Sequence, residues 1–187
     1  MGKKAAALWI LLIVCDPLIG GKTIRIGGNG FSFSITEPDG WQIDFRGASQ
    51  IANFVMHPEG SDWRQAPVVV FARFTPRGSR ETLESFADKD AEEFQKTCLF
   101  YEIQNIDLSL KGVRKFLSRE HSCPSVRNEI VAVTEVPGFF VTFVLSSDRR
   151  DSLQGAVPPF QEMLSSFDWA DQAPTPAPSP SPRPRRH

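Results

Sequence analysis

The chain lacks a hydrophobic run long enough to cross a bilayer comfortably. Its longest uninterrupted apolar segment, Ala5 to Cys15, has 11 residues, whereas a membrane-spanning helix needs about 20. Two lysines precede this segment, and Asp16 and a proline end it. A charged start followed by a short apolar run is typical of a secretory signal peptide. The sequence therefore predicts export, to the periplasm or out of the cell, with residues 1–21 as the signal.

The chain also lacks an excess of basic charge. Its formal net charge is −1, and three of its arginines lie after Gln172 in a proline-rich tail. Without the predicted signal and that tail, the remaining part carries a net charge of about −5. A protein that binds nucleic acid needs a basic face to replace the counterions of the phosphates. The composition thus excludes nucleic acid as the expected partner.

Cysteine is scarce, and the three cysteines divide between the predicted signal and the rest of the chain. Cys15 ends the apolar run, which leaves Cys98 and Cys123 as an even pair in an exported protein. Oxidising compartments favour disulfides, so we expect a bond between Cys98 and Cys123, with the two Cα atoms within about 7 Å. The alternative is two separate buried thiols.

Lipidation of Cys15 is a second reading of the N-terminus. The sequence Leu-Ile-Val-Cys that ends at Cys15 resembles a lipobox, although Val14 stands where a small residue is usual. Cleavage after Gly21 is the other possibility, and it places Ile19 where signal peptidase prefers a small side chain. The sequence leaves both open and favours soluble export.

No set of residues converges on a recognisable chemistry. The histidines are His57, His121 and His187, and only His121 has a cysteine close by, Cys123. A tetrahedral zinc site needs four ligands, or three when it is catalytic, and no Gly-x-Ser-x-Gly nucleophile motif is present. The sequence therefore predicts no catalytic residue, no metal and no cofactor.

What the chain does contain is alternating and apolar segments typical of strands. Turn residues separate them, including Pro38 to Gly40, Lys111–Gly112 and Pro137–Gly138. The run from Pro67 to Phe74 is nearly all apolar, which predicts a central strand covered on both faces. The expected strands are 31–35, 41–45, 51–57, 67–74, 103–110, 114–119, 129–135 and 139–145.

Two amphipathic helices are expected. The first begins after Gly78–Ser79, and Leu83, Phe86, Ala87, Phe94 and Cys98 fall on one of its faces at helical spacing. The second begins at Pro158–Pro159, and its apolar stripe consists of Phe160, Met163, Leu164 and Phe167. Hairpin-length connections indicate an antiparallel sheet. The prediction is an α+β fold, with an antiparallel sheet of about six strands flanked by two main helices.

Three motifs resemble one family. The segment Phe31 to Trp41 reads Phe-Ser-Phe-Ser-Ile-Thr-Glu-Pro-Asp-Gly-Trp, and it is similar to the opening of PsbP- and DcrB-like proteins. The helix that starts Ser-x-x-Thr-Leu-Glu-x-Phe resembles their middle, and the segment Phe160 to Trp169 resembles their closing helix. The resemblance implies a PsbP-like α/β/α sandwich and a mostly non-catalytic role; the family shares no catalytic motif to transfer.

These inferences divide the chain into four parts and suggest a class of function. The parts are a signal (1–21), a leader (22–30), a PsbP/DcrB-like domain (31–171) and a proline-rich, extended tail (172–187). We expect an exported, non-catalytic binding or accessory module of the cell envelope. Its partner would be a protein or envelope component, with membrane proximity possible through the N-terminus or the basic tail.

One contact point and two rival functions complete the reading. Trp63 beside Arg64 in a polar loop is a possible partner contact, since tryptophan and arginine are enriched at interfaces, although packing beneath the loop is the alternative. The rival functions are an envelope enzyme with an unrecognised site and a structural protein of the wall or membrane. His57 or His121 lining a deep pocket beside a carboxylate would favour the enzyme.

Overall fold

The fold described here comes from a computed structural model, which describes residues 21–28, 31–45, 54–112, 114–123 and 126–171. The predicted tail, and all of the predicted signal except Gly21, lie outside these residues.

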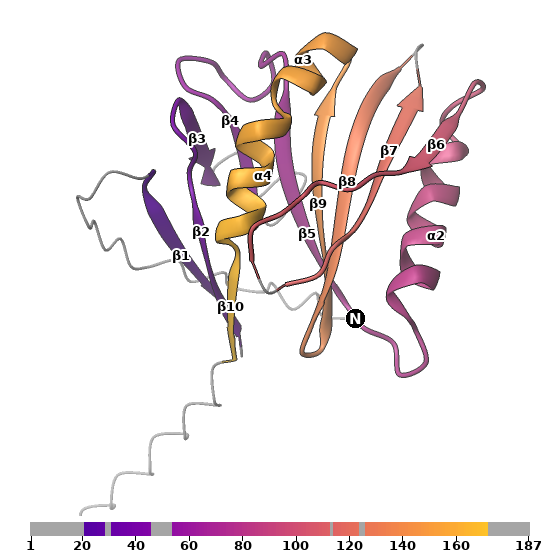
Figure 1. The fold of residues 1–187 in the computed structure, drawn as a ribbon, viewed down its shortest axis with the longest axis horizontal. Coiled ribbons are helices and arrows are strands. Elements are labelled where there is room, and N and C mark those ends of the chain that lie inside the picture. Colours follow the sequence, from indigo (N-terminus) through magenta and orange to yellow (C-terminus); the bar gives the residue numbers. More distant parts are fainter. Residues whose placement is uncertain (1–20, 29–30, 46–53, 113, 124–125, 172–187) are drawn as a thin grey trace, which may run out of the picture.

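A seven-stranded antiparallel sheet forms the centre of the molecule (Figure 1). Its strand order is β3-β4-β5-β9-β8-β7-β6. The strands are β3 (Trp41–Asp44), β4 (Phe54–Pro58), β5 (Val69–Pro76), β6 (Glu102–Asn105), β7 (Leu117–Cys123), β8 (Arg127–Val136) and β9 (Phe139–Ser147). The predicted Pro137–Gly138 turn joins β8 to β9, and Gly138 has a φ of 78°, which glycine adopts without strain.

A smaller sheet corrects the predicted start of the domain. Strand β1 (Thr23–Gly28) pairs with β2 (Phe31–Thr36), and β2 also pairs with β10 (Asp168–Asp171). Residues 22–30 were expected to form a leader outside the domain. The polar and glycine-rich end of this segment suggested a linker, but Ile24 and Ile26 are each 6% exposed and belong to the main core. The alternation of Ile24 and Ile26 makes β1 a half-buried strand of the domain.

Helices lie on both faces of the seven-stranded sheet (Figure 1). Helix α2 (Leu83–Gln95) packs on one face, and Thr82 caps its first turn by accepting a hydrogen bond from the Ser85 backbone N–H. Helices α3 (Arg150–Gly155) and α4 (Val157–Ser166) lie on the opposite face with the smaller sheet. The predicted α+β class, an antiparallel sheet between helical layers, is confirmed, with more strands than the expected six or so.

The most deeply buried strands are β8 and β9, not β5. Helix α2 contacts β7 and β8, so both faces of β8 and β9 are covered. On β5, Val70 and Ala72 are fully buried against the α4 side, whereas Phe71 is half-buried and Arg73 is exposed on the other side. The apolar run predicted a strand covered on both faces, but α2 covers neighbouring strands, so the second face of β5 is only partly covered.

The segment between β6 and β7 does not form the predicted hairpin at Lys111–Gly112. Residues 107–112 leave the sheet and run to α4 (Figure 1). The Leu108 carbonyl accepts a hydrogen bond from the Gln161 side chain, and the Lys111 N–H donates to Ser165 Oγ over 3.2 Å. Leu108 is 4% exposed in the main core. The apolar residues of this segment are buried against a helix and do not extend the pairing of β6 with β7. Strand propensity alone does not distinguish these two outcomes.

Candidate functional site

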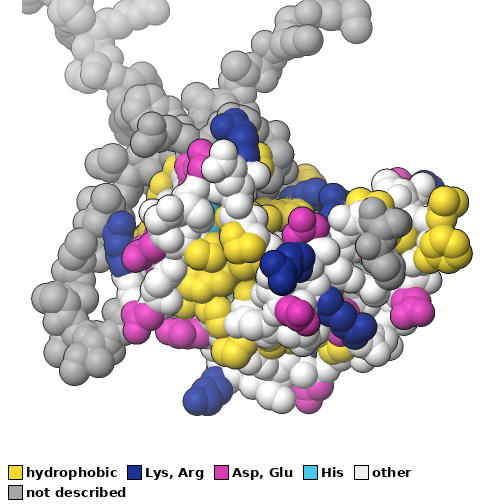
Figure 2. Space-filling model, turned by 90° about the horizontal axis from the view of Figure 1, so that it is seen from above, with side chains coloured by type: hydrophobic (Ala, Val, Ile, Leu, Met, Phe, Trp, Pro, Cys, Tyr) yellow, Lys and Arg dark blue, Asp and Glu magenta, His cyan; other side chains and the backbone are white. Residues whose placement is uncertain are grey.

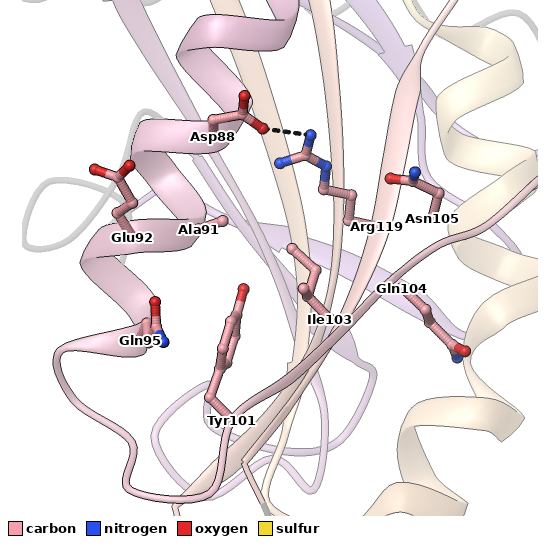
Figure 3. Close-up of a pocket in the computed structure, with 9 residues that line it drawn as sticks. All are labelled: Asp88, Ala91, Glu92, Gln95, Tyr101, Ile103, Gln104, Asn105 and Arg119. Atoms are coloured by element: carbon pink, nitrogen blue, oxygen red, sulfur yellow. Dashed lines mark hydrogen bonds and ion pairs between the residues drawn. The ribbon is translucent and has the colours of Figure 1, made fainter.

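A cavity of about 440 Å³ lies between α2 and the edge strand β6 (Figure 3). Helix α2 supplies one wall, and β6 with its neighbour β7 supplies the other. Its lining residues are Asp88, Ala91, Glu92, Gln95, Tyr101, Ile103, Gln104, Asn105 and Arg119.

One ion pair bridges the two walls of this cavity. The Arg119 guanidinium on β7 donates to the Asp88 carboxylate on α2 over 2.7 Å. The Arg119 side chain is 14% exposed and the Asp88 side chain 62% exposed. The ion pair therefore holds α2 against β7. Because the Asp88 carboxylate reaches into solvent, the mouth of the cavity stays open.

Tyr101 contributes a phenol group with no partner. Its hydroxyl is buried and makes no hydrogen bond among the described residues. Figure 3 shows the hydroxyl directed into the space between α2 and the strands. Burial raises the pKa of the Tyr101 phenol, and the Arg119 charge opposes that rise. A buried hydroxyl without a partner is uncommon, and here it offers a donor and an acceptor to a bound group.

His121 lies beside Tyr101, beneath the helix. The His121 side chain is 1% exposed, and neither ring nitrogen has a hydrogen-bond partner among the described residues. Its ring meets those of Phe94 and Tyr101 edge-on, with centroids 5.2 Å and 5.9 Å away. Burial, with a smaller effect from Arg119, lowers the pKa of His121 to about 4. The imidazole is therefore neutral at neutral pH and behaves as a core side chain.

Two acidic groups, Asp90 on α2 and Glu129 on β8, lie in a network of charges. Glu129, 5% exposed, accepts from Arg127 over 2.8 Å and from the Ser146 hydroxyl over 3.2 Å. Burial raises the pKa of Glu129, against the lowering effect of Arg127. Burial also raises the pKa of Asp90, and the charges of Arg73 and Arg119 oppose it. Arginines thus offset these buried acids, as a structural network requires.

A second cavity, of about 350 Å³, lies on the other side of β6. It is lined by Glu102, Ile103, Gln104, Glu120, Ser122 and Arg150. Glu120 is 7% exposed, accepts from the Gln104 amide over 2.9 Å and is 3.3 Å from the Arg150 guanidinium. Strand β6 is therefore flanked by a cavity on each face of the sheet.

The predicted disulfide closes this end of the molecule. Cys98 and Cys123 are bonded, with their Cα atoms 5.9 Å apart, which confirms the pairing and satisfies the distance condition. Cys98 follows α2 and Cys123 ends β7. The bond ties the end of the helix to the sheet beside β6.

An exposed apolar cluster surrounds the disulfide, and we call it the apolar tip. Among the described residues, four large hydrophobic side chains are exposed: Leu99 (94%), Phe100 (76%), Val126 (50%) and Ile103 (42%). All four lie within five residues of Cys98 or Cys123 in the sequence. Figure 2 shows hydrophobic side chains gathered at the right-hand end of the molecule, the side where Figure 1 places α2 and β6. A contiguous exposed apolar patch on a domain is typical of an interaction surface.

Sequence reasoning missed this tip, although a signal was present. Leu99–Phe100 is an apolar pair directly after the expected end of the helix, close to the cysteine pair. Val126 follows Cys123 by three residues, and the Val126 N–H donates to the Cys123 carbonyl within the same loop. The disulfide joins this loop to the segment after α2, which carries Leu99 and Phe100.

Trp63 and Arg64 lie far from this site along the sheet, in the connection between β4 and β5. The Trp63 ring is half-buried against the main core, and the Arg64 guanidinium sits 5.0 Å from its centroid. Trp63 thus packs beneath its loop, as the alternative reading expected, and a partner contact there stays a prediction. Trp41 and Trp169 are buried in the main core.

His57 lies near the end of β4, beside the turn that follows it, and does not line the cavity. It is 2% exposed, and its Nδ1 lies 3.0 Å from the Pro58 carbonyl and 3.3 Å from Ser61 Oγ. Within the described part of the chain, no three metal-ligating side chains gather at one place. In the same residues, no helix combines the length and apolarity of a membrane span.

Comparison with known proteins finds a similarity among solved structures. No family model matches the chain, and no curated protein matches it. Among solved structures, the chain is similar to cyanobacterial PsbP (CyanoP) from Synechocystis sp. PCC 6803, at 21% sequence identity and a TM-score of 0.47. That alignment covers 83% of this chain and 96% of the cyanobacterial protein.

Proposed function

We propose that this protein is an exported, non-catalytic binding or accessory module of the cell envelope, related to PsbP- and DcrB-like proteins, and that it binds a partner protein through the apolar tip. The observation that carries the proposal is the clustering of Leu99, Phe100, Ile103 and Val126 at one end, beside a disulfide. Leaving such side chains in water costs free energy that a partner's surface would recover.

Export is supported by two independent features. The N-terminal sequence has the charged start and short apolar run of a secretory signal. The Cys98–Cys123 bond suits an oxidising compartment, since disulfides rarely persist in the cytosol. Neither feature distinguishes soluble export from an anchor at Cys15.

The family relationship is supported by where its sequence motifs fall. The opening motif, Phe31 to Trp41, spans β2 and the turn into β3. The middle motif contains the Thr82 cap and the first turn of α2, and the closing motif runs through α4 into β10. All three occupy positions that shape the fold, so the resemblance concerns architecture and carries no chemistry.

The rival enzyme reading finds little support at the histidines. An enzyme would be favoured by His57 or His121 lining a pocket beside a carboxylate. Neither lines the cavities on the two sides of β6, and both side chains are almost fully buried.

The structural-protein reading rests on the basic tail, where Arg183, Arg185 and Arg186 would meet an anionic surface.

A site-specific photo-cross-linker tests the proposed function. Placed at Phe100 in the full chain in its native host, it should give one dominant adduct with an envelope protein. The matched control is the same cross-linker at Glu84, an exposed position in the first turn of α2. Leu99→Ser with Val126→Ser should abolish the adduct at Phe100. Equal or absent adducts at both positions would contradict the proposal.

Mass spectrometry of the mature protein tests export separately. The chain recovered from its native host should lack the residues before about Lys22. A lipid-modified Cys15 at the N-terminus would select the lipoprotein form. An intact Met1 in the cytoplasmic fraction would contradict export.

A further inference from the structure

Strand β6 ends the seven-stranded sheet, and its outer edge pairs with no strand among the described residues. The Ile106 N–H donates to the Ser118 carbonyl over 3.0 Å. In an antiparallel pair such bonding alternates along the strand, so Gln104 and Glu102 also direct their backbone groups toward β7. The backbone N–H and C=O groups of Ile103 and Asn105 therefore face outward.

Two cavities lie next to this edge, one on each face of the sheet. Ile103 and Asn105 point to the α2 face and line the first cavity, and the second cavity opens on the opposite face. In a strand added beside β6, successive side chains would point to opposite faces. Residues bonded to Ile103 and Asn105 would thus direct their side chains to the α2 cavity, and the residues between them to the second cavity.

The two cavities favour positive charge. Four carboxylates line them, from Asp88, Glu92, Glu102 and Glu120, against two guanidiniums, from Arg119 and Arg150. Each arginine is already paired with one of these carboxylates. The excess of negative charge on both sides of the edge complements lysine or arginine side chains.

We propose that β6 is a strand-addition site, and that its occupant is an extended basic segment of a partner protein. The segment would lie beside Ile103 and Asn105, hydrogen-bond to their outward backbone groups and direct its lysine or arginine side chains, which stand at every second position, into one of the two acidic cavities. The inference deepens the proposed function, since the apolar tip adjoins β6 and would contact the same partner.

The chain's own basic tail is a poorer occupant than a partner. Its prolines stand at every second position from Pro174 to Pro184, and the polyproline II conformation that they favour, with three residues per turn, does not match the two-residue repeat of a β-strand. Strand β10, after which the tail begins, lies on the far side of the molecule from β6 (Figure 1).

The test uses the full chain and a fluorescein-labelled octapeptide that alternates lysine and threonine, with fluorescence anisotropy as the readout. Asn105→Pro removes one outward N–H and leaves the bonds to β7 intact, whereas the control Asn105→Ala keeps that N–H. Relative to the alanine variant, which loses the same side chain, we expect proline to weaken binding about fivefold or more, the effect of losing a backbone hydrogen bond. Equal binding to the two variants would overturn the proposal.

A pair of modified peptides keeps the test decisive if Asn105→Pro fails to fold. The octapeptide is N-methylated either at its lysines or at its threonines. Strand addition directs only one set of N–H groups toward β6, so one peptide should lose binding and the other should keep it. Equal effects of both methylations would overturn strand addition in favour of simple charge attraction.

Two further outcomes separate this inference from its alternatives. If the unmodified peptide does not bind the full chain, strand addition fails, while cross-linking at Phe100 still decides the proposed function independently. If deleting residues 172–187 strengthens peptide binding tenfold or more, the tail occupies the edge, and the partner-segment proposal is overturned.

Discussion

Phe94 packs helix α2 against the disulfide and against two neighbouring rings, those of Tyr101 and His121. Its side chain is 7% exposed and packs with the disulfide, and its ring centroid lies 5.2 Å from that of His121 and 5.6 Å from that of Tyr101. The Arg127 guanidinium covers the ring at 5.5 Å. A single aromatic side chain thus supports the wall that carries the cavity.

Phe94→Ala should therefore lower the free energy of unfolding by about 3–5 kcal/mol, the usual cost of a buried aromatic-to-alanine change. Glu92→Ala, on the exposed face of the same helix, should change it by no more than about 0.5 kcal/mol. Urea unfolding followed by circular dichroism measures both. Similar costs at the two positions would contradict the assigned helix face.

His121 makes stability depend on pH. Burial lowers the pKa of its imidazole from 6.5 to about 4 in the folded chain, so between these values the unfolded chain binds a proton that the folded chain does not. Stability contributed by the neutral imidazole is complete above about pH 6.5 and is lost as the pH falls toward 4. The loss between about pH 7.5 and pH 5 should be about 2 kcal/mol.

The comparison with His121→Leu isolates this effect. Glu129 and Asp90, whose pKa values are raised by burial, act in the opposite sense, because their folded forms take up protons at higher pH than their unfolded forms. Urea unfolding of the wild type and the variant is measured at both pH values. The difference between the two proteins removes the contribution of Glu129 and Asp90, which both proteins share. The same pH dependence in both proteins would show that His121 titrates normally.

At the scale of elements, β1 is an integral strand of the domain. It pairs with β2 over six residues, and its Ile24 and Ile26 are each 6% exposed. A chain that starts at Phe31 should lose at least about 3 kcal/mol of unfolding free energy, since two buried isoleucines each contribute about 1.5–3 kcal/mol. A thermal midpoint equal to that of a chain starting at Lys22 would restore the leader interpretation.

The disulfide links two elements that are 25 residues apart in the sequence. By the loop-entropy estimate, closing such a loop stabilises the fold by about 3.5 kcal/mol. Cys98→Ser with Cys123→Ser should lose free energy of that order, measured by chemical unfolding without reductant. Treating the wild type with dithiothreitol should bring it to the same stability, and an unchanged wild type would mean that the bond is absent from the protein in solution.

At the scale of the whole molecule, the tail after β10 is expected to contribute little to stability. From Gln172 onward the chain consists of proline, small residues and basic residues, with no large apolar side chain. Deleting residues 172–187 should leave the thermal midpoint within about one degree, since such a terminus buries almost nothing. A fall of several degrees in a calorimetric scan would place the domain boundary beyond residue 171.

Local patterns determined much of this architecture from the sequence. The spacing of Leu83, Ala87 and Phe94 indicated one face of α2, and Pro137–Gly138 indicated the β8–β9 hairpin, because both features depend on neighbours along the chain. The disulfide was also predicted, since an even cysteine pair in a chain that is expected to be exported leaves one pairing.

Only the tertiary structure decided which surfaces each segment meets. Residues 106–110 alternate like a strand, yet the Leu108 side chain is buried in the main core and the Leu108 carbonyl bonds to α4. Residues 22–30 were interpreted as a leader, yet the pairing of β1 with β2 buries Ile24 and Ile26. The apolar tip and the open edge of β6 depend on the disulfide and on the order of strands in the sheet. The periodicity of a segment specifies which of its faces is apolar, whereas long-range packing determines which other element covers that face.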